Sequence, residues 1–227
     1  MKLGQGMLDW KTYEYLKLGR RRKNERDKCR RCQWYEISYE HFAIGVPASE
    51  SELIRLIAMT YSWMPTAALY SPTDSDSLSV ALRALTDYSR NDVPQEGQEK
   101  DDRLLKNALD CIHGATGLGI VPISKVMHFA FPSRVPMIDS HVAKVWRYIF
   151  RNDQKVWNPE VTAKLGISFP YSSGKGDRWG LAREAYIAYS NDMLQWHKNI
   201  SIVDASVDLR SIEKRLFLFS KFCLKKK

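Results

Sequence analysis

Apolar side chains recur every three or four residues along most of the chain, and this spacing restricts the fold more than any other feature of the sequence. Residues 49–64 show the pattern behind Ser49 and Glu52, which have the spacing of a helix-capping box. The same pattern predicts further helices at roughly 76–89, 101–113, 122–130, 140–151, 178–197 and 207–222. Residues 33–46 alternate only in part and could form a strand or an irregular segment. The chain is therefore expected to be all-α.

The basic residues are unevenly distributed along the chain, which has 227 residues and a net charge of +9 at pH 7. Residues 17–31 hold nine Lys or Arg side chains against two acidic ones, and residues 225–227 form a lysine tail. Such a stripe can contact nucleic-acid phosphates without reading sequence, although a solvated connector would have the same composition. We therefore expect a basic N-terminal segment at 1–48, followed by a helical domain at 49–227.

No run of apolar residues approaches the roughly 20 that span a bilayer, and the N-terminus has no continuous apolar core like that of a secretory signal. The four cysteines do not form the framework of a disulfide-rich secreted domain. These features predict a cytoplasmic protein that does not bind membranes.

Cys29 and Cys32 form one C-x-x-C pair, but no second pair completes a zinc site, so neither a metal nor a cofactor is expected.

The most informative stretch is 114–146, where glycines and prolines separate short helices. Gly117 and Gly119 flank Leu118 between two expected helices, and glycine permits the positive φ and close backbone approach of a tight turn. The amides at the start of the next helix would be free to bind a phosphate. After a short turn, Asp139 stands where an N-cap is expected. On residue chemistry alone, this aspartate could be no more than a cap.

The order of these parts resembles the helix-hairpin-helix DNA glycosylase superfamily, whose members carry LPGVGxKTA, AFG and VDTHV in succession. Gly117-Leu118-Gly119 corresponds to the hairpin glycines, Ala130-Phe131 to the end of the next helix, and residues 138–142 to the aspartate motif, without a gap. The resemblance implies an all-α fold of two packed helical subdomains. It also implies excision of a modified or damaged base that is flipped out of duplex DNA.

In such a protein, Asp139 would be the essential carboxylate, because it stabilises positive charge that develops on the sugar. The resemblance further implies that Gly117, Leu118 and Gly119 hold a DNA phosphate. In bifunctional members, a lysine nucleophile lies two positions after the second hairpin glycine, where this chain has Val121.

Lys125 lies one helical turn after Val121 and is the candidate amine nucleophile, since desolvation and nearby cations can lower the pKa of a lysine. It could instead pair with Asp139, lie at the surface, or contribute only its charge to the pocket. Residues 124–129 also resemble divergent, 8-oxoguanine-glycosylase-like members of the superfamily.

Two further residues near the motif are candidates for DNA contact. Arg134 lies in the turn before Asp139 and could bind a phosphate. His141 follows the aspartate, where it could contact DNA or hydrogen-bond within the turn.

Helical spacing favours core packing for the aromatic residues Trp146, Trp179, Trp196 and Tyr186. The same reasoning places the C-terminal apolar stripe, Leu209, Ile212, Leu216 and Phe219, toward the core.

Two other functions remain open from the sequence. The first is a non-catalytic helix-hairpin-helix module, because the same hairpin can bind backbone phosphate without performing chemistry. The second is an enzyme of the glycosylase fold that acts on a nucleoside or an RNA base, for which the basic stripe would be less useful.

Overall fold

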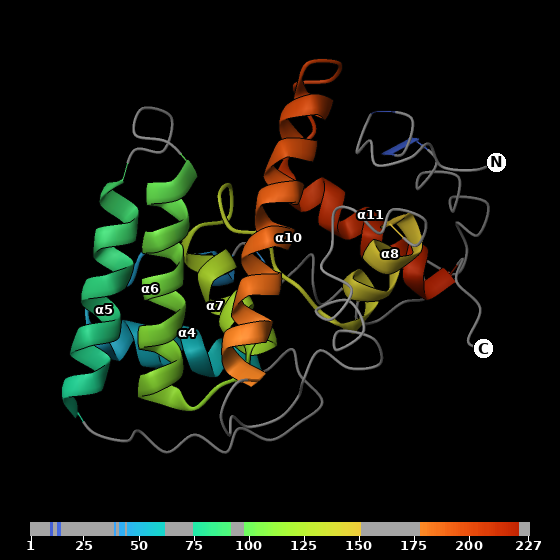
Figure 1. Ribbon diagram of the computed structural model, residues 1–227. Coiled ribbons are helices and arrows are strands. Elements are labelled where there is room, and N and C mark those ends of the chain that lie inside the picture. The colour runs from blue at the N-terminus through green and yellow to red at the C-terminus, as the bar shows by residue number, and fades with distance from the viewer. Residues whose placement is uncertain are drawn as a thin grey trace.

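The computed structural model describes residues 10, 13–14, 39, 41–43, 45–61, 75–91, 98–150 and 178–222 (Figure 1). Their principal elements are the helices α4 (Glu50–Tyr61), α5 (Ser75–Arg90), α6 (Gln98–Thr116), α7 (Ile120–Ala130), α8 (Ser140–Phe150), α10 (Arg178–Ser201) and α11 (Leu209–Phe222). No strand occurs among the described residues. The prediction of an all-α protein is therefore confirmed.

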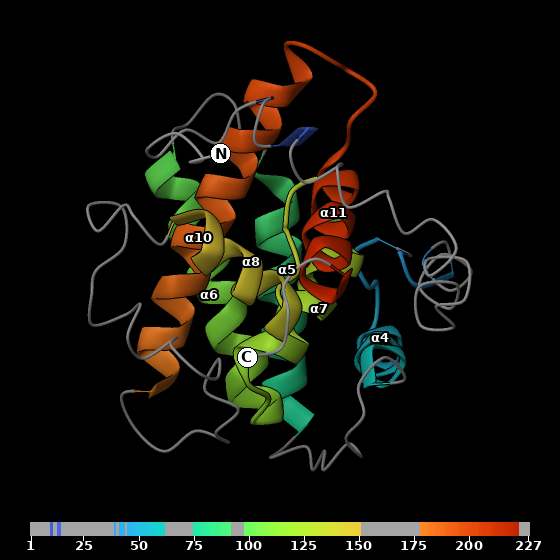
Figure 2. The same ribbon diagram turned by 90° about the vertical axis from the view of Figure 1, so that its right-hand side faces the viewer.

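The helices surround α7, which lies in the middle of the molecule (Figures 1 and 2). The α5 and α6 helices form the most extensive pair, and α4 packs against α7. The long α10 helix contacts α6, α7 and α11, while α11 packs against α8. Every residue of α7 except Pro122 is buried, so this short helix has neighbours on all sides.

The sequence predicted the position of most helices to within a few residues, and two details differ. Gly114 lies inside α6, which continues to Thr116, so the turn is shorter than the glycine spacing suggested. No Cβ contact would arise at Gly114, and a helix accepts an exposed glycine at a cost of about 1 kcal/mol relative to alanine. Tyr39, His41 and Phe42 are helical, so at these residues the structure shows neither of the alternatives, a strand or an irregular segment, that the sequence left open for 33–46.

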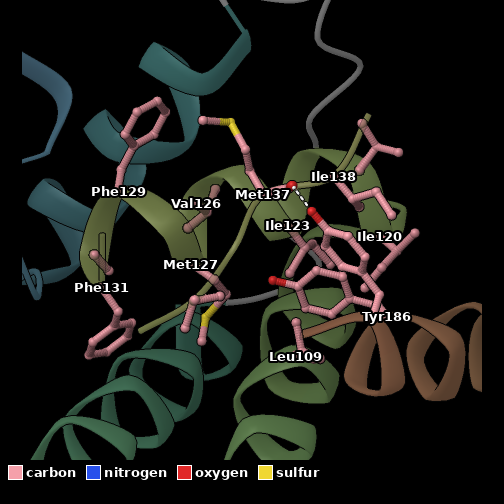
Figure 3. Close-up of a cluster of buried hydrophobic side chains, with 14 of the residues drawn as sticks. Leu109, Ile120, Ile123, Val126, Met127, Phe129, Phe131, Met137, Ile138 and Tyr186 are labelled. Atoms are coloured by element: carbon pink, nitrogen blue, oxygen red, sulfur yellow. Dashed lines mark hydrogen bonds between the residues drawn. The ribbon is translucent and has the colours of Figure 1, made fainter. Parts of the chain in front are cut away.

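The buried apolar side chains of all seven helices belong to one cluster, part of which is shown in Figure 3. Tyr13, Tyr39 and Phe42 belong to the same cluster, so parts of the N-terminal 48 residues pack on the helical body. The described residues therefore show no separate cores for the two helical subdomains that the resemblance implied. Core packing is confirmed for Trp146, Trp196, Tyr186, Leu209, Ile212, Leu216 and Phe219.

Several predictions concern residues outside the described part of the chain. The basic stripe at 17–31, the lysine tail at 225–227, and both Cys29 and Cys32 fall in this group. Within the described residues, no helix combines the length and the apolar character that crossing a bilayer requires.

Candidate functional site

The connection from α6 to α7 is a tight turn of three residues, Gly117–Gly119, which we call the glycine turn. Gly117 has a φ of 65°, a left-handed conformation that glycine adopts without steric penalty, as the sequence predicted. The Nδ1 atom of His113 lies 2.7 Å from the carbonyl oxygen of Leu118, and the Leu118 amide donates to the Thr116 hydroxyl at 3.2 Å. Leu118 is buried and Gly117 is exposed, so the turn presents backbone to the surface.

The start of α7 has no side-chain cap. Its N-cap is Gly119, whose conformation is extended and which has no side chain to accept a hydrogen bond. The amides of the first turn of a helix have no acceptor within that helix, and the helix dipole makes this end positive. The glycine turn therefore leads into a helix end whose first amides, those of Ile120 and Val121, have no side-chain cap, while Pro122 has no amide.

Helix α10 braces the glycine turn through α6. The indole of Trp179 stacks on the His113 ring, with centroids 4.0 Å apart and planes 7° from parallel. Trp179 Nε1 donates to Asp110 at 2.6 Å, and Arg183 donates to both oxygens of the same carboxylate at 2.7 Å. The predicted packing role of Trp179 is thus combined with a polar contact.

The connection from α7 to α8 is the run of residues 131–139, which we call the aspartate segment. Its residues 135–138 are buried, yet their backbone groups find partners in buried side chains of three helices. The hydrogen bonds are His128 Nδ1 to Val135 O (2.7 Å), Tyr186 Oη to Pro136 O (2.7 Å), Tyr189 Oη to Met137 O (3.0 Å), Met137 N to Glu213 Oε1, and Ile138 N to Ser124 Oγ (3.2 Å). Met137 and Ile138 pack beside Ile123 and Tyr186 (Figure 3).

Asp139 ends this segment and caps α8, as predicted. Its Oδ1 accepts the Val142 amide at 2.8 Å, and α8 begins at the next residue, Ser140. The side chain is half-buried, so it is not enclosed in packed hydrocarbon. The carboxylate thus faces an amide donor and the positive end of a helix.

Lys125 projects from the middle of α7, and its side chain is buried, with only 8% of the residue exposed. Burial lowers the pKa of its ammonium, and the negative charge of Asp139 opposes part of that shift. The interaction with Asp139 is coulombic and acts through space, without a hydrogen bond between the two side chains. The structure therefore places Lys125 close enough to Asp139 for their charges to interact, and a common site for the two residues stays a prediction.

Arg134 and His141 are placed differently from the expectation of DNA contact. The Arg134 guanidinium lies 3.8 Å from the centroid of the Tyr88 ring, donates to the Tyr88 carbonyl at 2.8 Å, and pairs with the buried Asp101. These partners hold it within the fold, so the structure does not support the phosphate contact. His141 Nδ1 lies 3.1 Å from Ser220 Oγ, which favours the alternative that it supports the local structure.

Sequence reasoning missed the buried polar residues that hold the aspartate segment, above all Glu213. The sequence contained part of the information needed to find Glu213, because this residue follows Leu209 by four positions and precedes Leu216 by three. That position lies on the buried face of the helix, where a carboxyl group requires a partner. The partner is the backbone of Met137, which the sequence could not identify.

Comparison of the chain with protein families, with curated proteins and with solved structures gave no match.

Proposed function

We propose that this protein is a DNA glycosylase that excises a modified or damaged base, with Asp139 as the essential carboxylate and Lys125 as the amine nucleophile. One observation carries the proposal above the others. A buried lysine, whose pKa is lowered by burial, has as its charged neighbour a half-buried aspartate at the start of a helix. Structural lysines are rarely buried without an ion pair, whereas nucleophilic lysines require this kind of environment.

The chemistry assigns a separate task to each residue. The negative charge of Asp139 would stabilise the positive charge that develops on the sugar as the glycosidic bond breaks. The Lys125 nitrogen would use its lone pair to form a bond to C1′ of the sugar. The base would leave with the electron pair of the broken C1′–N bond and take up a proton. One of the two nitrogen protons is lost to the departing base. The C1′–O4′ bond then breaks, O4′ keeps the bonding pair and takes up the second nitrogen proton, and the nitrogen lone pair completes an imine between Lys125 and C1′.

Binding of the DNA backbone would use the glycine turn and the first amides of α7. Gly117 is exposed there and no side chain caps the helix, so a phosphate could approach the backbone closely. The basic stripe at 17–31 would add contacts that do not depend on sequence.

The first test compares two aspartates that perform the same structural task. Asp139 caps α8, and Asp208 caps α11 by accepting the Ser211 amide at 2.8 Å. Asparagine is an equally good N-cap, so both Asp→Asn variants should fold normally. The proteins would be incubated with duplexes that contain 8-oxoguanine, uracil or an alkylated base. We expect Asp139→Asn to lower the excision rate at least about 100-fold, and Asp208→Asn to leave it unchanged.

The second test identifies the amine. Borohydride reduces an imine to a stable amine, so it should trap wild-type protein covalently on a substrate duplex. Lys125→Met should abolish this adduct, whereas Lys198→Met, which removes an exposed lysine of α10, should not. Excision without any trapped adduct would assign a hydrolytic mechanism and overturn the role of Lys125.

Two outcomes would replace the proposal with the alternatives. DNA binding that survives Asp139→Asn, without turnover of any substrate, would indicate a non-catalytic nucleic-acid-binding module. Excision that free nucleosides inhibit by competition would indicate an enzyme acting on nucleosides or RNA bases.

A further inference from the structure

Glu213 is a buried carboxyl group to which the proposed chemistry assigns no task. It lies on the inner face of α11 with 2% of its surface exposed. Its Oε1 accepts the amide of Met137, two residues before Asp139, and its Oε2 is buried without a hydrogen-bond partner. A carboxylate with one oxygen unsatisfied would be expensive at this depth, so its protonation state requires explanation.

The surroundings of Glu213 favour the neutral acid. Burial raises the pKa of this carboxyl well above its ordinary value, and the nearby negative charges of Asp139 and Asp208 raise it further. The Met137 amide and the positive charge of Arg210 act in the opposite direction but do not reverse the shift.

The remaining titratable groups around Glu213 do not supply a compensating positive charge. His128 on α7 has its Nδ1 3.7 Å from Glu213 Oε1, which is within reach of an ion pair. However, its Nδ1 contacts Val135 O at 2.7 Å and its Nε2 lies 3.0 Å from the Tyr39 hydroxyl, so a neutral ring satisfies both nitrogens. Burial also lowers the pKa of His128 to about 4. On α10, Tyr186 and Tyr189 are buried and un-ionised, because burial raises their pKa values.

We propose that Glu213 is a positioning residue for Asp139, holding the Met137 amide as a neutral carboxylic acid. This inference rests on the proposed function, because it assigns Glu213 to the same catalytic carboxylate. The contact fixes the aspartate segment from the side of α11, while Ser124 fixes the next residue, Ile138, from α7. The aspartate segment thereby holds Asp139 at a fixed place relative to Lys125.

The neutral form matters because a second negative charge beside Asp139 would disturb both members of the proposed pair. It would favour protonation of Asp139, and it would stabilise the charged form of Lys125, which is the unreactive one. A protonated carboxyl provides the acceptor that Met137 needs without adding this charge. Glutamine would do the same with nearly the same shape, which supplies the conservative variant for a test.

The first experiment needs no substrate. The ¹³C signal of the Glu213 carboxyl carbon, assigned by its absence from Glu213→Gln, would be followed by NMR as the pH is changed. We expect this signal to stay at its protonated position between about pH 5 and pH 7, a range in which a glutamate of ordinary pKa is largely ionised. Titration of Glu213 in the ordinary range would overturn the neutral-acid assignment.

The second experiment measures positioning directly by hydrogen exchange. Glu213→Leu leaves the Met137 amide without an acceptor, so exchange at Met137 and at Val142, which is bonded to Asp139, should accelerate about 10-fold or more. Glu213→Gln should retain the protection. Thr60→Val, which removes a buried hydroxyl bonded to Leu56 on α4, should leave both amides unchanged. Equal protection in Glu213→Leu and wild type would overturn the positioning role.

Kinetics provide the third measurement. Glu213→Leu should lower kcat about 10- to 100-fold with little change in KM, because misplacement of Asp139 affects the chemical step. Glu213→Gln should restore kcat and the wild-type pH profile. The proposal would be contradicted if KM rose as kcat fell in Glu213→Leu, or if Glu213→Gln did not restore kcat. Should Glu213→Leu fail to fold, the titration and the glutamine variant still decide.

The proposed function and the role of Glu213 fail separately in these experiments. A wild-type protein that excises no base would refute the glycosylase activity, whereas the titration and the exchange rates would still show whether Glu213 positions Asp139 as a neutral acid.

Discussion

The two connections that flank α7 are held in opposite ways. The glycine turn is fixed by close neighbours in the sequence, since the Leu118 carbonyl contacts His113 and the Leu118 amide contacts Thr116. The aspartate segment is fixed by side chains from distant parts of the chain, because Met137 bonds to Tyr189 and to Glu213, which are 52 and 76 residues away. One connection is held locally and is partly exposed, and the other is buried along residues 135–138 and held from three helices.

This difference separates the two tasks of the proposed site. A phosphate is bound by backbone amides, which need only the local geometry of the glycine turn. A catalytic carboxylate must be held to within a fraction of an ångström, which local backbone geometry alone does not ensure. The buried polar contacts of the aspartate segment provide that restraint, and each of them offers a way to test the comparison.

The largest effect should come from acid. His128 has a pKa lowered to about 4 in the folded protein and an ordinary value of 6.5 when unfolded. Between these values the unfolded chain binds a proton that the folded protein does not, so stability falls as the pH decreases through this window. His128 alone should lower the free energy of unfolding by about 3 kcal/mol between pH 7 and pH 4. The raised pKa values of Glu213 and Asp192 act in the opposite direction, so the loss is measured as the difference between wild type and His128→Gln in urea denaturation at the two pH values.

The acid effect should act on the aspartate segment rather than on the glycine turn. The amides of Val135, Met137 and Ile138 should lose hydrogen-exchange protection at the acid end before that of Leu118 does. His128→Gln removes the titrating ring and should remove this loss. An unchanged acid sensitivity in this variant would show that another group is responsible.

Two tyrosines test the buried hydrogen bonds without changing any charge. Tyr186→Phe and Tyr189→Phe each remove one hydroxyl and leave a buried carbonyl, of Pro136 or Met137, without its donor. Each should lower the free energy of unfolding by about 2 kcal/mol, measured by denaturant titration. Losses below about 0.5 kcal/mol would mean that the aspartate segment does not depend on these contacts.

The smallest effect is expected in the glycine turn. Gly117→Ala places a side chain at a φ of 65°, and no atom within 4 Å would meet the new Cβ, so only backbone strain opposes it. The free energy of unfolding should fall by about 1 kcal/mol.

Gly114→Ala is the matched control for this substitution, because Gly114 is helical and its new Cβ would also meet nothing. It should raise the free energy of unfolding by up to about 1 kcal/mol. A loss at both positions would show that the left-handed conformation of Gly117 is not the cause.

The same distinction explains what could be predicted from the sequence. The glycine turn and the N-cap at Asp139 depend on residues within a few positions of one another, and both were predicted. The buried stripe of α11 was predicted from its helical spacing, whereas the partner of Glu213 was not. A hydrogen bond across 76 residues depends on how α11 docks, and no local pattern contains that information.

Arg134 illustrates the same point from the opposite direction. Its position in the turn before Asp139 suggested a phosphate contact. The structure instead pairs it with Asp101 and Tyr88, which belong to α6 and α5. The sequence shows which residue is available for an interaction, but the tertiary packing decides which partner it meets.

The dependence of the aspartate segment on α10 and α11 has a consequence for the order of assembly. Tyr186, Tyr189 and Glu213 are synthesised after Asp139, and none can bind the segment before its helix has docked. Contacts between residues so far apart in sequence form only after the intervening chain has been ordered. In a nascent chain the glycine turn, whose contacts are local, can therefore form before Asp139 is held in its final position.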